Sequence, residues 1–294
     1  MERRIEGGFG KKIERKDIVD KAFSLAKEIL RRTQINESDF GDVYSSEEIN
    51  KDKEYVEKRN SEFKESRDKE GGDNQENFKL ATIFEAIVVI TREWFGKNCQ
   101  TFKTANFDDI ANGVDVVAQL SKGEGDNSSK SIGFAIDVTF HNEFENKIDR
   151  IRNEIEKGKL PTVKYFRPGS KNAQGQPPEI VRAVISASKD TVIELAETLI
   201  MATKNPKILF ENQFQFQALD EIIYQLKTYE AYARTIGKDS IAEKYGQALS
   251  QIRGAKKERS ESLTDEHQRD MLFEGLVSYL SSSFKPKSEQ PPRA

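Results

Sequence analysis

The sequence has few of the residues on which disulfide-stabilised, zinc-binding and membrane proteins depend. Its 294 residues contain one cysteine and two histidines, which excludes an internal disulfide framework and argues against a structural zinc site. No apolar run approaches the roughly 18–20 residues that a membrane span needs, and the charged start MERRIEGGFGKKIERKD differs from a signal peptide. The sequence therefore predicts a cytoplasmic protein that makes no membrane contact.

A net basic charge is also absent. The chain has 47 Lys and Arg residues against 50 Asp and Glu residues, a formal net charge of −3, so a surface that binds nucleic acid has to be local. Residues 143–171 have such a local surplus, with eight basic and five acidic residues. Within this segment Arg167 and Lys171 fall in an exposed loop rich in Gly and Pro, where basic side chains can contact phosphates. These two residues are therefore candidates for nucleic-acid binding.

The apolar residues are grouped in blocks that divide the chain into four regions. Residues 1–77 contain an amphipathic helix and then a highly charged segment, for which a solvated helix and a linker are both open. Residues 78–188 alternate helix and strand patterns and predict a folded core. Residues 189–281 predict a helical region packed on or following that core, and residues 282–294 a disordered tail.

The core region predicts an α/β fold of α+β type, in which helices flank a mixed sheet. Its first helix, FKLATIFEAIVVITREWFG, is apolar on most sides and is therefore expected to lie against the sheet. Three short segments that follow are rich in β-branched and aromatic residues, as strands are. The expected order is a helix from residue 78, strands over 99–105, 113–120 and 131–140, a helix over 143–158, and strands over 161–166 and 179–188.

Three acidic residues lie in apolar surroundings. Asp115 and Asp137 occur inside predicted strands, where Asp is disfavoured and an unpaired buried charge is costly. Glu85 interrupts the apolar run of the first helix. If the second and third strands pair as a hairpin, the two aspartates come side by side and need a cation between them, and oxygen ligands alone suit Mg²⁺ or Mn²⁺. The competing interpretation makes Asp115 and Asp137 strand-end residues that face solvent or cap a turn, and places Glu85 at an exposed position of the helix.

A second pair of acids precedes this site. Asp108 and Asp109 are close enough in sequence to Asp115 to contribute to the same site. Alternatively, they cap or shape the loop before the strand, as Asp commonly does.

The layout of Glu85, Asp115 and Asp137 resembles that of the PD-(D/E)XK nuclease superfamily, over residues 78–188 only. In that superfamily an acid on the second strand and one on the third hold a divalent ion, supported by a glutamate on the leading helix. The resemblance implies a restriction-endonuclease-like fold with Asp115 and Asp137 as catalytic metal ligands. It further implies Glu85 in the helix position, the carbonyl of Val138 as an additional ligand, and Mg²⁺ or Mn²⁺ as the cofactor.

The chain departs from the family pattern at the catalytic lysine, which normally follows the third-strand acid by two residues. That position is Thr139, and a hydroxyl cannot supply the positive charge of an ammonium. Some members of the superfamily carry the lysine on the next helix, and Lys147 lies about one turn into that helix. Lys147 is therefore the candidate for the missing catalytic residue. The alternatives are a Lys147 that is simply solvated and a domain that has lost its activity.

The leading functional prediction is a metal-dependent nuclease that hydrolyses phosphodiester bonds, with DNA rather than RNA as the expected partner. The alternative is a catalytically inactive domain that binds nucleic acid or protein through the retained fold. A purely structural helical scaffold is a third option, which leaves acids inside two apolar strands unexplained. A homodimer is compatible with the first prediction, because many enzymes of this type use two sites to cut two strands.

Overall fold

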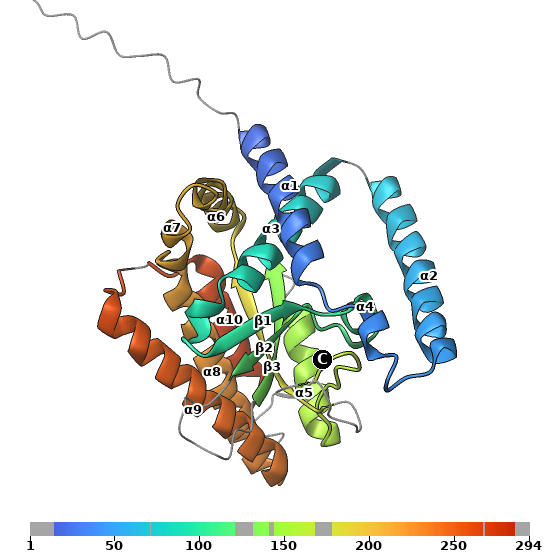
Figure 1. Ribbon diagram of the computed structural model, residues 1–294. Helices are drawn as coiled ribbons and strands as arrows, with labels where there is room; N and C mark the ends of the chain where they lie inside the picture. The colour runs from blue at the N-terminus through green and yellow to red at the C-terminus, as the bar shows by residue number, and fades with distance from the viewer. Residues whose placement is uncertain are drawn as a thin grey trace, which may run out of the picture.

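The computed structural model describes residues 15–70, 72–120, 132–140, 144–167, 178–266 and 268–285. Over these residues the chain forms one four-stranded sheet surrounded by helices (Figure 1). This confirms the α/β class with mixed sheet and flanking helices that the sequence predicts. None of the helices in the described ranges has the length and apolar character needed to cross a membrane.

Helices make up most of the described chain. The first five are α1 (Arg15–Thr33), α2 (Ser46–Glu70), α3 (Gly72–Ile90), α4 (Asn106–Asn112) and α5 (Phe144–Lys157). The C-terminal set is α6 (Lys189–Ala202), α7 (Lys207–Phe210), α8 (Phe214–Thr235), α9 (Asp239–Ser262) and α10 (Met271–Ser283). Two short 3-10 helices, η1 (Glu37–Phe40) and η2 (Arg92–Phe95), lie in the connections.

The sheet has the strand order β1-β2-β3-β4. Its strands are β1 (Cys99–Lys103), β2 (Val116–Leu120), β3 (Ile132–Phe140) and β4 (Val181–Ala187). The first three pair antiparallel, whereas β4 pairs parallel to β3. A parallel neighbour requires a crossover connection, and α5 lies in it. The chain therefore passes from β3 through α5 to β4, which lies beside β3.

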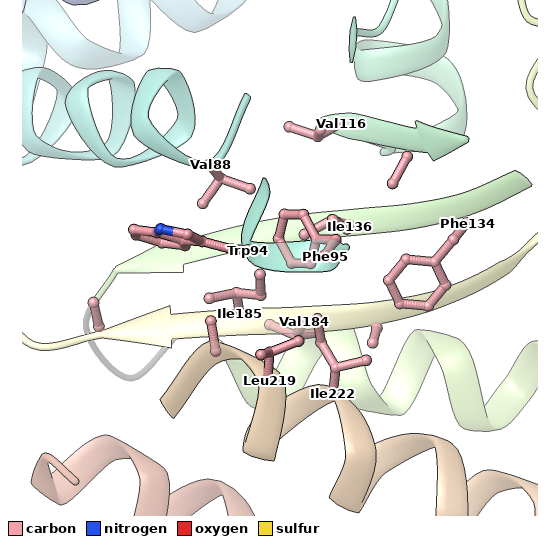
Figure 2. Close-up of a cluster of buried hydrophobic side chains, with 14 of the residues drawn as sticks. Val88, Trp94, Phe95, Val116, Phe134, Ile136, Val184, Ile185, Leu219 and Ile222 are labelled. Carbon is pink, nitrogen blue, oxygen red and sulfur yellow. The ribbon is translucent and has the colours of Figure 1, made fainter. Parts of the chain in front are cut away.

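The core lies between the sheet and the helices that cover it. On α3 the buried side chains include Ile83, Phe84 and Ile87, which explains why this helix is apolar on most sides. Figure 2 shows Leu219 and Ile222 of α8 pointing toward Val184 of β4, and all three belong to one continuous apolar cluster. Burying a side chain of this size contributes about 1.5–3 kcal/mol. The C-terminal helices are thus part of the same core as the sheet.

Three side chains of α8 bind the outer edge of β4. Gln225 accepts a hydrogen bond from the Val184 N–H at 2.8 Å and donates one to the Val184 carbonyl at 2.7 Å. One turn earlier, Glu221 accepts from the Ser186 N–H at 2.7 Å. Gln217, one further turn back, donates to the Ser186 carbonyl at 3.4 Å. The spacing of four residues keeps the three on one helix face, so they satisfy the main chain of β4 where a further strand would.

The predicted strand over 161–166 is wrong. The segment makes one isolated bridge, between Thr162 and Glu179. Its following amides are used elsewhere, because the N–H groups of Lys164 and Tyr165 donate to the Asp108 carboxylate at 2.7 and 2.8 Å. A side chain therefore replaces the neighbouring strand that a ladder would need.

Of the two interpretations of the charged segment, a helix or a linker, the structure shows the helix. The charged segment after α1 forms the helix α2, with Ile49 and Val56 buried, and α3 begins before the predicted residue 78. The predicted tail from 282 is wrong for its first residues, because α10 continues to Ser283 and the Phe284 ring lies 5.0 Å from the Tyr229 ring. Residues 286–294 lie outside the described residues.

Candidate active site

Asp115 and Asp137 face each other at the start of β2. The β2–β3 register pairs Val116 with Ile136, and one step further along both chains places Asp115 opposite Asp137. Opposed residues on antiparallel strands project from the same face of the sheet. Asp115 is tied to β3 directly, because its Oδ2 accepts a hydrogen bond of 2.7 Å from the Val138 N–H. The structure therefore brings the two acids onto one side of one strand pair.

Lys147 completes this group from α5. Its Nζ lies 2.9 Å from Asp115 Oδ2 and 2.8 Å from the Val138 carbonyl oxygen. The helix carries an apolar stripe (Phe144, Ile148, Ile151 and Ile155) that is buried, and Lys147 stands beside that stripe. The crossover after β3 thus returns an ammonium to the end of the strand that carries Asp137. The interpretation of Lys147 as a solvated surface residue is wrong.

Asp137 has its own cationic partner in β4. Its Oδ2 lies 3.2 Å from Nη1 of Arg182, and both residues are almost completely buried. Arg182 Nη2 also donates to the Asn112 carbonyl, at 2.9 Å. The second carboxylate oxygen, Asp137 Oδ1, is buried and has no hydrogen-bond partner among the described residues. Arg182 therefore holds Oδ2 of Asp137, whereas Oδ1 could act as a ligand.

Glu85 lies in an adjoining ion-pair group centred on Lys103. The Lys103 Nζ lies 2.5 Å from Glu85 Oε1 and 2.8 Å from Asp109 Oδ2, and the lysine is buried. The structure thus places Glu85 on a lysine rather than in solvent. Of the two acids before the strand, Asp109 joins the charged cluster whereas Asp108 shapes the loop by binding two main-chain amides.

The charges of this cluster leave one negative charge in excess. Four carboxylates (Glu85, Asp109, Asp115 and Asp137) meet three cations (Lys103, Lys147 and Arg182) in the contacts described above. A buried excess charge is costly unless a proton or a further cation neutralises it. One more positive charge would therefore neutralise the cluster.

The pKa values indicate which carboxylates of the cluster carry the negative charge. Burial raises the pKa of Asp137 to about 6, although Arg182 and Lys147 oppose the shift. Burial likewise raises the pKa of Glu85 to about 7, against the pull of Lys103. Burial also disfavours the Asp115 anion, but Lys147 and Lys103 outweigh it, so the pKa of Asp115 is lowered. Asp115 is the firmly ionised member of the cluster.

The residues present fit a small divalent cation. Asp115, the free oxygen of Asp137 and the Val138 carbonyl supply only oxygen donors, the set that Mg²⁺ and Mn²⁺ prefer. The part of the chain that the structure describes contains no group of three or more His, Cys, Asp or Glu side chains placed to hold a metal. The set here is smaller, two carboxylates and one main-chain oxygen, and Glu85 is engaged by Lys103.

Of the two predicted phosphate contacts, the structure describes Arg167 alone. Arg167 is 3.6 Å from Asp42, and its guanidinium stacks 5.2 Å from the Phe40 ring centroid. Arg167 therefore packs on the end of η1, and its side chain is only 13 % exposed. Lys171 lies outside the described residues.

Lys103 and Arg182 are the site residues that the sequence patterns did not single out. Each is the one charged residue of its strand (CQTFK and VRAVISA), which is the signal that the sequence offers. A buried cation of this kind requires a buried anion. No protein-family model, curated protein or solved structure matches this chain, so the site is defined by its own residues alone.

Proposed function

We propose that this protein is a metal-dependent nuclease of the PD-(D/E)XK type that hydrolyses phosphodiester bonds in DNA. The observation that carries the proposal is the contact of Lys147 with Asp115 and the Val138 carbonyl. It gathers an acid from β2, an acid-bearing strand end from β3 and an ammonium from α5. These are the three chemical groups that the proposed reaction requires.

The order of elements supports the same family. A leading helix (α3) precedes three antiparallel strands, and a crossover helix (α5) leads to a parallel fourth strand. The resemblance implies the same order of a helix, three strands, a helix and a strand, and α4 is an addition between β1 and β2. In this arrangement Asp115 lies at the start of the second strand and Asp137 within the third.

Each residue has a definite task in the proposed reaction. Mg²⁺ or Mn²⁺, held by Asp115, Asp137 and the Val138 carbonyl, would supply Lewis-acid stabilisation of the charge that develops on the attacked phosphate. The Lys147 ammonium would add a positive charge and hydrogen-bond donors next to the attacked phosphate, where such donors lower the barrier. Arg182 is a positioning residue, because it fixes the carboxylate plane of Asp137.

The competing proposal is a binding domain without catalysis, and two observations favour it. Each acid of the cluster already has a cation of this chain beside it. Thr139 stands in the motif position of the lysine, and its buried hydroxyl has no hydrogen-bond partner among the described residues. Such a domain would bind nucleic acid with or without Mg²⁺ and leave it intact.

A cleavage assay separates the two proposals. Single-stranded DNA, duplex DNA and RNA are incubated with the full chain in Mg²⁺, in Mn²⁺ and in EDTA. We expect metal-dependent cleavage by the wild type, its loss in Asp137→Asn, and no change in the matched control Asp17→Asn, which alters an exposed acid of α1. Binding of the same substrates without cleavage in any metal would favour the binding domain.

A further inference from the structure

The Lys147 ammonium occupies the space between two of the oxygens that would hold a divalent ion. Its Nζ is 2.9 Å from Asp115 Oδ2 and 2.8 Å from the Val138 oxygen. Ligand oxygens lie about 2.0–2.6 Å from Mg²⁺ or Ca²⁺, so one ion bound to both oxygens would fall in the same space. The ammonium and the ion therefore exclude each other by volume as well as by charge.

Resting on the proposed function, we infer that Lys147 is a built-in counter-cation that competes with the divalent ion for this site. In the metal-free protein it neutralises Asp115 and satisfies the Val138 carbonyl. When a divalent ion binds, the ammonium has to leave these oxygens. Its side chain is 29 % exposed, so it has a path toward solvent.

The remaining oxygen of the proposed site, Asp137 Oδ1, favours a divalent ion over the ammonium. Lys147 hydrogen-bonds two oxygens, whereas Asp137 Oδ1 is buried and has no hydrogen-bond partner among the described residues. With the single charge of the ammonium, the four carboxylates also face three cations, so full ionisation of the cluster leaves one negative charge in excess. An ion of charge +2 in its place supplies the missing charge, and the displaced ammonium is then free to bind an anion.

Exchange of the two cations separates this inference from a fixed ion pair. If Lys147 only stabilised the fold, removing its charge would weaken the site for every cation, because the geometry of Asp115 would be lost. If Lys147 competes, removing its charge strengthens divalent binding, although cleavage is lost. Opposite effects on binding and on cleavage are the signature of the competition.

The test is calorimetric titration of the full chain with Mn²⁺ and Mg²⁺. We expect Lys147→Met, which keeps the length and removes the charge, to bind Mn²⁺ about 10-fold or more tightly than the wild type, because no ammonium has to be displaced. Lys147→Arg keeps the charge and should bind no more tightly. The matched control Lys157→Met, at the exposed end of the same helix, should equal the wild type. Mn²⁺ binding by Lys147→Met that is equal to or weaker than wild type would overturn the inference.

A second measurement uses the wild type and therefore does not depend on a variant that folds. Amine acetylation followed by mass spectrometry reports the accessibility of each lysine. We expect the Lys147 rate to rise several-fold at saturating Mn²⁺ while the Lys157 rate stays constant. An unchanged Lys147 rate, or no Mn²⁺ binding by wild type and Lys147→Met alike, would contradict the inference. Metal exchange without cleavage of any nucleic acid would instead contradict the nuclease and leave the competition standing.

Discussion

Arg182 and Asp137 form an ion pair in the centre of the protein, 3.2 Å apart, with side-chain exposures of 0 % and 2 %. The pair joins β4 to β3, and through the Asn112 carbonyl it also joins the end of α4. Removing either partner of a buried ion pair destabilises the folded protein, because the remaining charge is left without a partner and without water.

We expect Arg182→Met to destabilise the protein by about 3–5 kcal/mol, since it leaves the Asp137 carboxylate buried without its partner. Urea unfolding at pH 7 measures the loss. Arg150→Met is the matched control, because Arg150 donates to the same Asn112 carbonyl from a more exposed position. A loss below about 1 kcal/mol for Arg182→Met would show that the pair is unimportant for stability.

If the protein is the nuclease proposed above, Lys147→Ala should lower the cleavage rate by about 10²-fold or more, because the proposal places this positive charge beside the attacked phosphate. Lys157→Ala should have little effect. The single-turnover rate at saturating Mn²⁺ makes the comparison, so that tighter metal binding by the variant cannot hide the loss. Equal rates for the two variants would remove Lys147 from the catalytic residues.

Glu221 should make stability depend on pH. Burial raises the pKa of Glu221 to about 8, from an ordinary value of 4.5, although bonds from Ser186 and Gln217 oppose the shift and Asp270 adds to it. The folded protein therefore holds a proton here that the unfolded chain releases near pH 4.5. The stabilisation is complete below pH 4.5 and is lost as the pH rises to about 8, by roughly 5 kcal/mol at most.

Glu221→Gln tests this dependence, because an amide keeps the shape of the protonated acid and does not ionise. The variant should lose less stability than the wild type between pH 5.5 and 8.5 in parallel urea titrations. Glu194→Gln, on the exposed side of α6, is the control. Identical slopes for wild type and Glu221→Gln would show that Glu221 does not hold a proton at neutral pH.

Gly113 should resist substitution. It ends α4 with a φ of +56°, and an added Cβ would lie 1.9 Å from Nη1 of Arg150. Gly113→Ala should therefore cost about 1–2 kcal/mol and displace Arg150. Gly254→Ala, inside α9 with nothing near its Cβ position, should be neutral or stabilising by up to ~1 kcal/mol. Thermal unfolding of the two variants compares them directly, and equal melting temperatures would contradict the expectation.

The acids could be predicted from the sequence because local rules govern them. Side-chain alternation and antiparallel pairing are enough to bring Asp115 opposite Asp137, and helix periodicity is enough to place Lys147 beside the apolar stripe. Their partners could not be predicted in the same way. Lys103 and Arg182 show only that a strand contains a cation, and which carboxylate each contacts depends on the packing of elements far apart in sequence.

The predicted strand over 161–166 failed for a related reason. Its β-branched and aromatic residues have strand propensity, but propensity does not say where the main-chain amides find acceptors. Here Asp108 supplies the acceptor, from a helix more than fifty residues away. The sequence pattern likewise does not show that Asp52, in the charged segment of α2, accepts a hydrogen bond from the Lys164 ammonium.

The row of Gln217, Glu221 and Gln225 along β4 also limits how two copies of the protein can associate. Subunits often join by aligning their outermost strands into one continuous sheet. At β4 that route would require α8 to give up its hydrogen bonds to Val184 and Ser186. It would also require the apolar side chains of the same helix to leave the core. A dimer built to cut both strands of a duplex would therefore have to join through a surface other than the edge of β4.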